Sequence, residues 1–175
     1  MSLRIVPLDR HHDRTGFDCG EPALNVYWQR LARHQAQRDF SRIHVAESLS
    51  ETPGDATRRI KGFYAISSGS IEFKNLPAAL KLPRHRVPVA RMNRLAVNLR
   101  EQGHGLGVAL LAHAMQLSAT LAQQIGLYAL VVDAQHEAAA GFYARYGFQR
   151  FADHELSLFL TTDVIRRAIA VPAQR

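Results

Sequence analysis

Apolar and polar positions follow two periods along this chain. Short apolar runs bounded by turn-forming residues are typical of strands, and apolar residues three or four positions apart are typical of helices. The first pattern predicts strands over residues 5–8, 43–48, 60–68, 87–97, 127–133, 148–151 and 156–160. The second predicts a helix that begins at about Pro22, and further helices over residues 105–123, 137–146 and 162–170. Residues 49–58 and 74–86 are rich in turn formers and are expected to be loops.

The order of these elements defines the expected fold class. One strand and one helix come first, several strands follow, and strands then alternate with helices before a closing pair of strands. The run 127–133 is apolar throughout, which is typical of a strand buried on both faces. We therefore expect an α/β fold with a mixed central sheet of about six to seven strands and helices on both faces. With no repeat and no long linker, residues 1–175 are expected to form a single domain.

Cysteine content and hydropathy narrow the cellular setting. The chain has 175 residues and one cysteine, Cys19, so it cannot form an internal disulfide. No apolar run approaches the roughly 20 residues of a membrane span. The N-terminal stretch lacks the apolar core of a signal peptide. We expect a protein of the cytoplasm that does not enter the membrane.

The charge balance predicts an anionic partner. The net charge is +7, and arginine supplies most of the positive charge, since only three residues are lysines. Arginine suits bidentate contacts to phosphate. A nucleic acid or a phosphorylated cofactor fits such a surface. The alternative is a basic surface that serves only solubility.

Three glycines, Gly103, Gly105 and Gly107, lie between the predicted strand 87–97 and the helix that follows. Glycine permits close approach of the backbone to a ligand, and the N–H groups at a helix start bind anions. The pattern therefore indicates a pyrophosphate cradle. No Gly-Lys-Ser/Thr follows it, which argues against a Walker A loop, and a Rossmann fingerprint fits poorly. The alternative is a tight turn without a ligand.

Two motifs resemble the GNAT N-acetyltransferases. "REQGHG" (100–105) matches the family signature R/Q-x-x-G-x-G/A, and "DAQHEAAAGFYARYGF" (133–148) is similar to its second hallmark. The resemblance covers roughly residues 40–160 and implies that the chain binds acetyl-CoA. It places the pyrophosphate on the glycine turn and the pantetheine arm along the preceding strand. The implied cofactor-binding residues are Leu95, Ala96, Val97, Arg100, Gln102, Gly103, His104, Gly105, Leu106 and Gly107.

A narrower resemblance extends over nearly the whole chain. "FDCGEPALNVY", "GFYAISSGSIEF" and "LPRHRVPVARMNRLAV" are similar to segments of the TacT-like and AtaT-like toxins. That subfamily acetylates the α-amino group of aminoacyl-tRNA and so blocks translation. It implies two partners, aminoacyl-tRNA and a cognate antitoxin of the ribbon-helix-helix type, and often a homodimer. A tRNA substrate needs phosphate contacts over a broad face. The candidates for RNA binding are Arg30, Arg33, Arg38, Lys81, Arg84, Arg86 and Arg91.

Acetyl transfer needs an acid to protonate the departing thiolate, or a group that orients the sulfur. Tyr143 occupies the catalytic position of the family in "GFYARYGF", and the alternative is an aromatic residue of the core. Cys19 is expected to be structural, and Asp133 either caps a loop or contributes to catalysis. No histidine spacing indicates a metal. Two other functions remain open: acetylation of a small amine or a protein N-terminus, and a non-catalytic module that binds acetyl-CoA or RNA.

Overall fold

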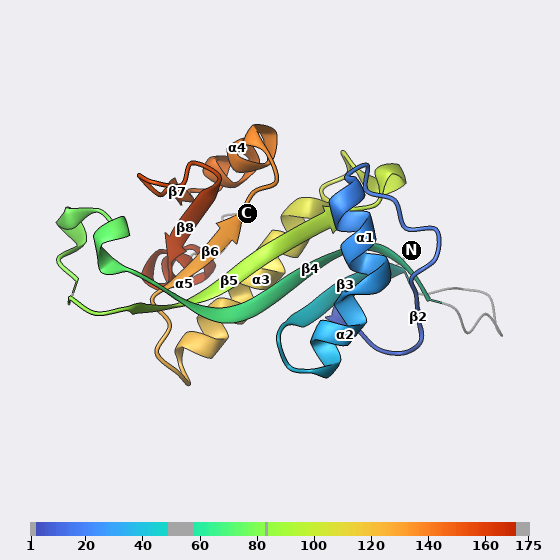
Figure 1. The fold of residues 1–175 in the computed structure, drawn as a ribbon, viewed down its shortest axis with the longest axis horizontal. Helices are drawn as coiled ribbons and strands as arrows, with labels where there is room; N and C mark the ends of the chain where they lie inside the picture. Colours follow the sequence, from blue (N-terminus) through green and yellow to red (C-terminus); the bar gives the residue numbers. More distant parts are fainter. Residues whose placement is uncertain (1–2, 49–57, 83, 171–175) are drawn as a thin grey trace. The chain divides into compact units, whose positions relative to one another are not determined.

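The computed structural model describes residues 3–48, 58–82 and 84–170 (Figure 1). They belong to two compact units, of which the first comprises residues 1–66 and 94–113. The second comprises residues 67–93 and 114–175. Two long strands, β4 (Arg58–Ile71) and β5 (Val87–Val97), contribute residues to both units.

The sheet of the first unit has the order β1-β3-β4-β5. Strands β1 (Leu3–Pro7) and β3 (Arg42–Ser48) pair antiparallel, and β3 pairs antiparallel with β4. The end of β5 lies beside β4. A short strand, β2 (His12–Asp13), pairs with the start of β4 and lies off this path.

Helices cover both faces of this sheet (Figure 1). Helix α1 (Pro22–Arg30) packs Tyr27 and Trp28 against the face of β4 that carries Phe63. Helix α3 (Leu106–Ala122) starts on the opposite face, where Gly62 allows a close approach. A Cβ atom at Gly62 would lie 2.8 Å from the Ala96 carbonyl oxygen and 3.0 Å from Leu110 Cδ1. The expected arrangement of helices is therefore confirmed within this unit.

The strands that contribute to the second unit have the order β4-β5-β6-β8-β7. Strand β6 (Ala129–Asp133) is parallel to β5 and antiparallel to β8 (Ser157–Thr161), which pairs in turn with β7 (Gln149–Arg150). Parallel and antiparallel pairs thus occur together, which confirms the predicted mixed sheet. Helices α4 (Glu137–Arg145) and α5 (Thr162–Ala170) contact β8.

Several predicted boundaries were wrong. The helix expected from Pro22 onward divides at Leu31, and a second helix, α2 (Ala32–Gln37), follows. Three 3-10 helices were missed: Phe73–Asn75 and Ala78–Leu80 within the expected loop, and Leu99–Glu101 after β5. The described residues form eight strands, one more than expected, because β2 had no apolar run to reveal it. The loop predicted over 49–58 lies outside the described residues, except that Arg58 begins β4.

Candidate active site

The glycine turn before α3 is open to a ligand. Gly103 and Gly105 have φ angles of +79° and +84°, a conformation that favours glycine over other residues. A Cβ atom on either would meet no other atom within 4 Å, so the space beside the turn is free. The first N–H groups of α3 have no intrahelical partner, as at any helix start, and they carry the positive end of the helix dipole. The turn fits a pyrophosphate in both shape and charge.

The side chain of Gln102 holds this turn in place. Its Nε2 donates to the Cys19 carbonyl at 2.9 Å and to the Val97 carbonyl at 3.0 Å. Both hydrogens of the amide are thereby used, and the remaining Oε1 is an acceptor that a phosphate does not attract. Gln102 can therefore contact a phosphate only through its backbone N–H, and its side chain acts as a positioning group.

The segment before α1 forms the other half of this support. The Asp18 carbonyl accepts from the Leu99 N–H at 2.8 Å, and the Asp18 carboxylate accepts from the Gly20 N–H and from Asn25 Nδ2, each at 2.8 Å. Asn25 Oδ1 in turn accepts from the Cys19 N–H at 3.0 Å. These bonds shape the segment "CGEPALN" into a loop that braces the glycine turn.

Cys19 is part of this brace. Its Sγ lies 3.2 Å from Asn25 Oδ1, and burial raises the pKa of the thiol. A buried thiol with a raised pKa is a poor nucleophile. The structure thus supports the expected structural role.

The other cofactor-binding candidates lie in the same unit. Leu95, Ala96 and Val97 end β5, beyond the β5–β6 ladder, which ends at Met92. Leu106 is buried, so only its backbone faces the turn, whereas Arg100 and His104 are exposed. Gly107 lies in the first turn of α3.

Tyr143 lies in the second unit, on α4, and its side chain is 4% exposed. Its ring contacts Phe142 and Phe148, with centroids 5.3 and 5.9 Å away. Burial, and then the negative charge of Asp133, raises the pKa of the Tyr143 hydroxyl, which therefore stays protonated at neutral pH. No hydrogen bond from the described residues contributes to this pKa shift.

Arg91, one of the RNA-binding candidates, forms an ion pair within the protein. Its guanidinium donates to both carboxylate oxygens of Asp133, at 2.8 and 3.2 Å, and the Ser157 hydroxyl donates to the same carboxylate at 2.8 Å. The structure thus gives Arg91 a partner inside the protein, and Asp133 anchors the end of β6 against β5 and β8.

The remaining RNA-binding candidates differ in their exposure and in their hydrogen bonds to the rest of the protein. Arg30 is exposed, whereas Arg33 donates to the Arg10 carbonyl at 3.3 Å. Arg86 donates to the Ser70 hydroxyl at 2.8 Å. Exposed cations that make no ion pair within the described residues remain in both units: Arg30 and Arg38 in the first, Lys81 and Arg84 in the second.

Three aromatic residues of the first unit form a cluster that no sequence motif indicated. The Tyr64 hydroxyl lies 2.7 Å from His113 Nδ1, and the His44 ring stacks on Tyr64 with centroids 4.9 Å apart. Burial, and the nearby His113 and Arg42, lower the pKa of His44 to about 4. The register pairs His44 with Tyr64 across β3 and β4, and only that register brings them together.

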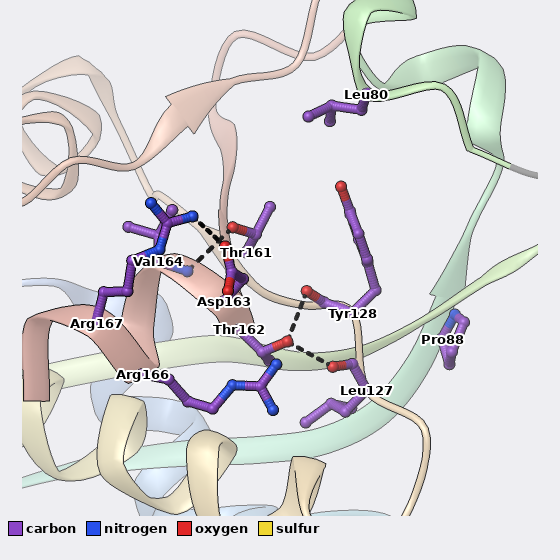
Figure 2. A pocket seen from close by; sticks show the side chains of 10 residues that line it. All are labelled: Leu80, Pro88, Leu127, Tyr128, Thr161, Thr162, Asp163, Val164, Arg166 and Arg167. Atoms are coloured by element: carbon purple, nitrogen blue, oxygen red, sulfur yellow. Dashed lines mark hydrogen bonds and ion pairs between the residues drawn. The ribbon is translucent and has the colours of Figure 1, made fainter. Parts of the chain in front are cut away.

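Figure 2 shows a separate open pocket of about 580 Å³ in the second unit, beside the start of α5. The Thr162 hydroxyl donates to the carbonyls of Leu127 and Tyr128 at 2.8 and 3.0 Å and fixes the helix there. The pocket contains none of the residues predicted for catalysis or binding.

No group of three or more histidine, cysteine or acidic residues in the described part of the chain can hold a metal. No helix there is long and apolar enough to cross a membrane.

A mixed sheet with a glycine turn at the start of α3 is the arrangement expected of an acetyltransferase of the GNAT type. The Acetyltransferase (GNAT) domain profile matches residues 39–150, more than half of the chain, and the chain belongs to this family. A tRNA-acetylating toxin of Mycobacterium tuberculosis is 37% identical over 150 residues, which cover 85% of each chain. A probable toxin TacT of Sinorhizobium fredii is 32% identical over 173 residues, 93% of this chain and 92% of the relative.

Solved structures of related toxins resemble this chain over nearly its whole length. A tyrosine-to-phenylalanine mutant of KacT has a TM-score of 0.88 at 30% identity and covers 96% of this chain and 99% of its own. AtaT complexed with acetyl-methionyl-tRNAfMet has a TM-score of 0.86 at 30% identity, covering 97% and 100%. A tyrosine-to-phenylalanine mutant of AtaT, bound to acetyl-CoA and the C-terminus of the antitoxin AtaR, has a TM-score of 0.83 at 27% identity, covering 97% and 99%.

Proposed function

We propose that this protein is a toxin that transfers an acetyl group from acetyl-CoA to the α-amino group of aminoacyl-tRNA and thereby blocks translation. The observation that carries the proposal is the open glycine turn at Gly103 and Gly105, in a chain 37% identical to a tRNA-acetylating toxin. AtaT, at a TM-score of 0.86, has been solved with acetyl-methionyl-tRNAfMet, a product of this reaction.

The acetyl donor supplies a thioester, and residues 95–107 bind it. The backbone N–H groups of Gly103, His104, Gly105, Leu106 and Gly107 bind the pyrophosphate, and Arg100 adds a positive charge. The backbone of Leu95, Ala96 and Val97 pairs with the pantetheine arm and polarises the thioester carbonyl. Fixed donors of this kind stabilise the oxyanion that forms during acyl transfer.

Tyr143 supplies the proton for the leaving group. The amine nitrogen of the substrate forms a bond to the acetyl carbon, the carbon–sulfur bond breaks, and the sulfur takes a proton from the Tyr143 hydroxyl. The amine loses its proton to solvent, and the Tyr143 oxygen takes a proton back from solvent. A buried hydroxyl with a raised pKa is held in its protonated form, which suits an acid rather than a base. The amine of an aminoacyl ester is less basic than that of lysine, so no strong base is needed.

The exposed cations bind the RNA. The first group lies on α1, on α2 and directly after α2, and consists of Arg30, Arg33 and Arg38. The second group lies in the segment before β5 and consists of Lys81, Arg84 and Arg86. The absence of acidic residues from 22–38 keeps the first group attractive to phosphate. Arg91 is left out of this set because Asp133 neutralises it.

Its partners follow from the same function. We infer a cognate antitoxin of the ribbon-helix-helix type, a homodimer as the working form, a single catalytic domain over residues 1–175 and a place in the cytoplasm, where aminoacyl-tRNA is found. AtaT has been solved with the C-terminus of the antitoxin AtaR, and this complex supports the inference that the present chain also binds an antitoxin.

The test is transfer of radiolabelled acetyl from acetyl-CoA to charged tRNA. Deacylated tRNA is the first control, and charged tRNA whose amine is already acetylated is the second. We expect the label to appear only on charged tRNA whose α-amino group is free. Label on a small amine or a protein N-terminus, with none on charged tRNA, would overturn the proposed substrate while keeping the acetyltransferase.

A further inference from the structure

The turn after α2 presents an aromatic side chain to solvent. The Phe40 N–H donates to the Gln35 carbonyl at 3.0 Å, and the Asp39 N–H donates to the Ala36 carbonyl at 3.3 Å. Asp39 has a φ of +60°. These are the bonds and the left-handed residue of a Schellman motif, which closes the end of a helix.

In such a motif the residue at the position of Phe40 usually packs on an apolar residue of the last helical turn. Here that residue is Gln35, which offers no apolar partner. The Phe40 side chain is instead 60% exposed, the most exposed of the large apolar side chains that the structure describes. Folding alone gives no reason to keep an apolar ring there, because an exposed ring gains nothing from burial.

The surroundings of the ring are cationic. The guanidinium carbon of Arg38 lies 4.9 Å from the ring centroid. Asp39 is the only acidic residue in 22–41, and Arg42 pairs with it at 2.7 Å. Arg42 also donates to the Ala36 carbonyl at 3.1 Å, which fixes the turn further. An exposed aromatic ring thus lies beside a guanidinium that makes no ion pair within the described residues.

We propose that Phe40 stacks on an unpaired base of the RNA substrate while Arg38 contacts the adjoining phosphate. Single-stranded RNA is recognised by stacking its bases on aromatic side chains and arginine planes. A peptide partner fits the turn poorly, because its other residues, Arg38, Asp39, Ser41 and Arg42, are charged or polar and provide no apolar groove. This inference rests on the proposed function, since it assumes an RNA substrate.

The test compares Phe40→Ala and Phe40→Trp with Ile125→Ala. Ile125 is the matched control because it is 57% exposed in the turn after α3, beside glutamines rather than arginines. We expect Phe40→Ala to raise the Kd and the KM for charged tRNA by about 5- to 150-fold, the range for loss of one stacked base. Its KM for acetyl-CoA should not change. Phe40→Trp should stay near the wild type, and its added indole fluorescence should be quenched by a single-stranded RNA oligonucleotide.

Three failures are distinguishable. If the wild type labels charged tRNA and Phe40→Ala binds and acetylates it normally, the stacking role is wrong and the proposed function stands. If the wild type labels no charged tRNA, the proposed function itself fails. If Phe40→Ala weakens binding of an antitoxin but not of tRNA, the turn is a protein-docking surface and the inference is overturned.

Discussion

The Arg91 guanidinium and the Asp133 carboxylate are joined by two hydrogen bonds, of 2.8 and 3.2 Å. Arg91 lies on β5 and Asp133 ends β6, so the pair closes the end of the ladder between these parallel strands. The ion pair of Arg91 and the proposed RNA contact of Arg84 should therefore be separable by mutation.

Replacing Arg91 and Arg84 by alanine should give opposite results. Arg91→Ala leaves the half-buried Asp133 with only the Ser157 hydroxyl, so the free energy of unfolding should fall by about 1 kcal/mol or more. The Kd for charged tRNA should change less than twofold. Arg84→Ala should leave stability unchanged and reduce the slope of log K against log salt by about 1. Denaturant unfolding and binding at several salt concentrations measure both. Weaker tRNA binding by a fully stable Arg91→Ala would restore its RNA-binding role.

Replacing Tyr143 by phenylalanine should separate chemistry from binding. No hydrogen bond from the described residues contributes to the pKa shift of this hydroxyl, so folding and acetyl-CoA affinity should stay close to those of the wild type. The kcat for acetyl transfer to charged tRNA should fall by about 10²-fold or more, the scale of general acid catalysis. Calorimetry and single-turnover transfer measure the two effects. Tyr146→Phe, at the exposed residue that directly follows the same helix, is the control and should stay active. Normal turnover by Tyr143→Phe would remove the tyrosine from the mechanism.

Replacing Gly105 by alanine tests the glycine turn, and Gly16→Ala is a control with similar backbone strain. Gly105 and Gly16 have φ angles of +84° and +71°, and neither would bring a Cβ within 4 Å of another atom. Alanine at either site should cost about 1–2 kcal/mol of stability. Only Gly105→Ala places a methyl group in the space assigned to the pyrophosphate, so only it should raise the KM for acetyl-CoA, by tenfold or more. Equal KM values in both variants would argue against a cradle at this turn.

Acidification should weaken the first unit through His44. Its pKa is about 4 in the folded chain and near 6.5 when unfolded, so the unfolded state takes up the proton first. Stability is present above pH 6.5 and is lost as the pH falls toward 4, by at most about 3 kcal/mol. His44→Phe keeps a ring on Tyr64 and should flatten this part of the pH profile. His34→Gln, at an exposed position of α2, should not. Urea unfolding at pH 7 and pH 5 distinguishes them.

The sequence revealed the parts of the fold that depend on local pattern. The helix at 105–123 appears as Leu106–Ala122 because its apolar stripe is regular, and the stripe is buried from Leu106 to Ala114. The glycine turn was recognisable because positive φ angles select glycine so strongly. Helix α4 contains a run of alanines and ends before Gly147, whose φ is +91°.

What the sequence could not reveal depends on contacts between distant segments. The break at Leu31 has no glycine or proline to mark it. The pairing of Arg91 with Asp133 depends on the register of two strands separated by a helix. The stacking of His44 on Tyr64 likewise depends on which residues of β3 and β4 are opposite. No spacing within one segment encodes these pairings.

The amide of Gln102 ties the glycine turn to Cys19 and Val97. The conformational entropy of the turn is therefore lost when the chain folds, before any acetyl-CoA arrives. Binding then carries no further ordering cost for this loop, and the affinity reflects the contacts themselves. Gln102→Ala should shift that cost to the binding step, so that acetyl-CoA would bind with a less favourable entropy at a loop that must first be ordered.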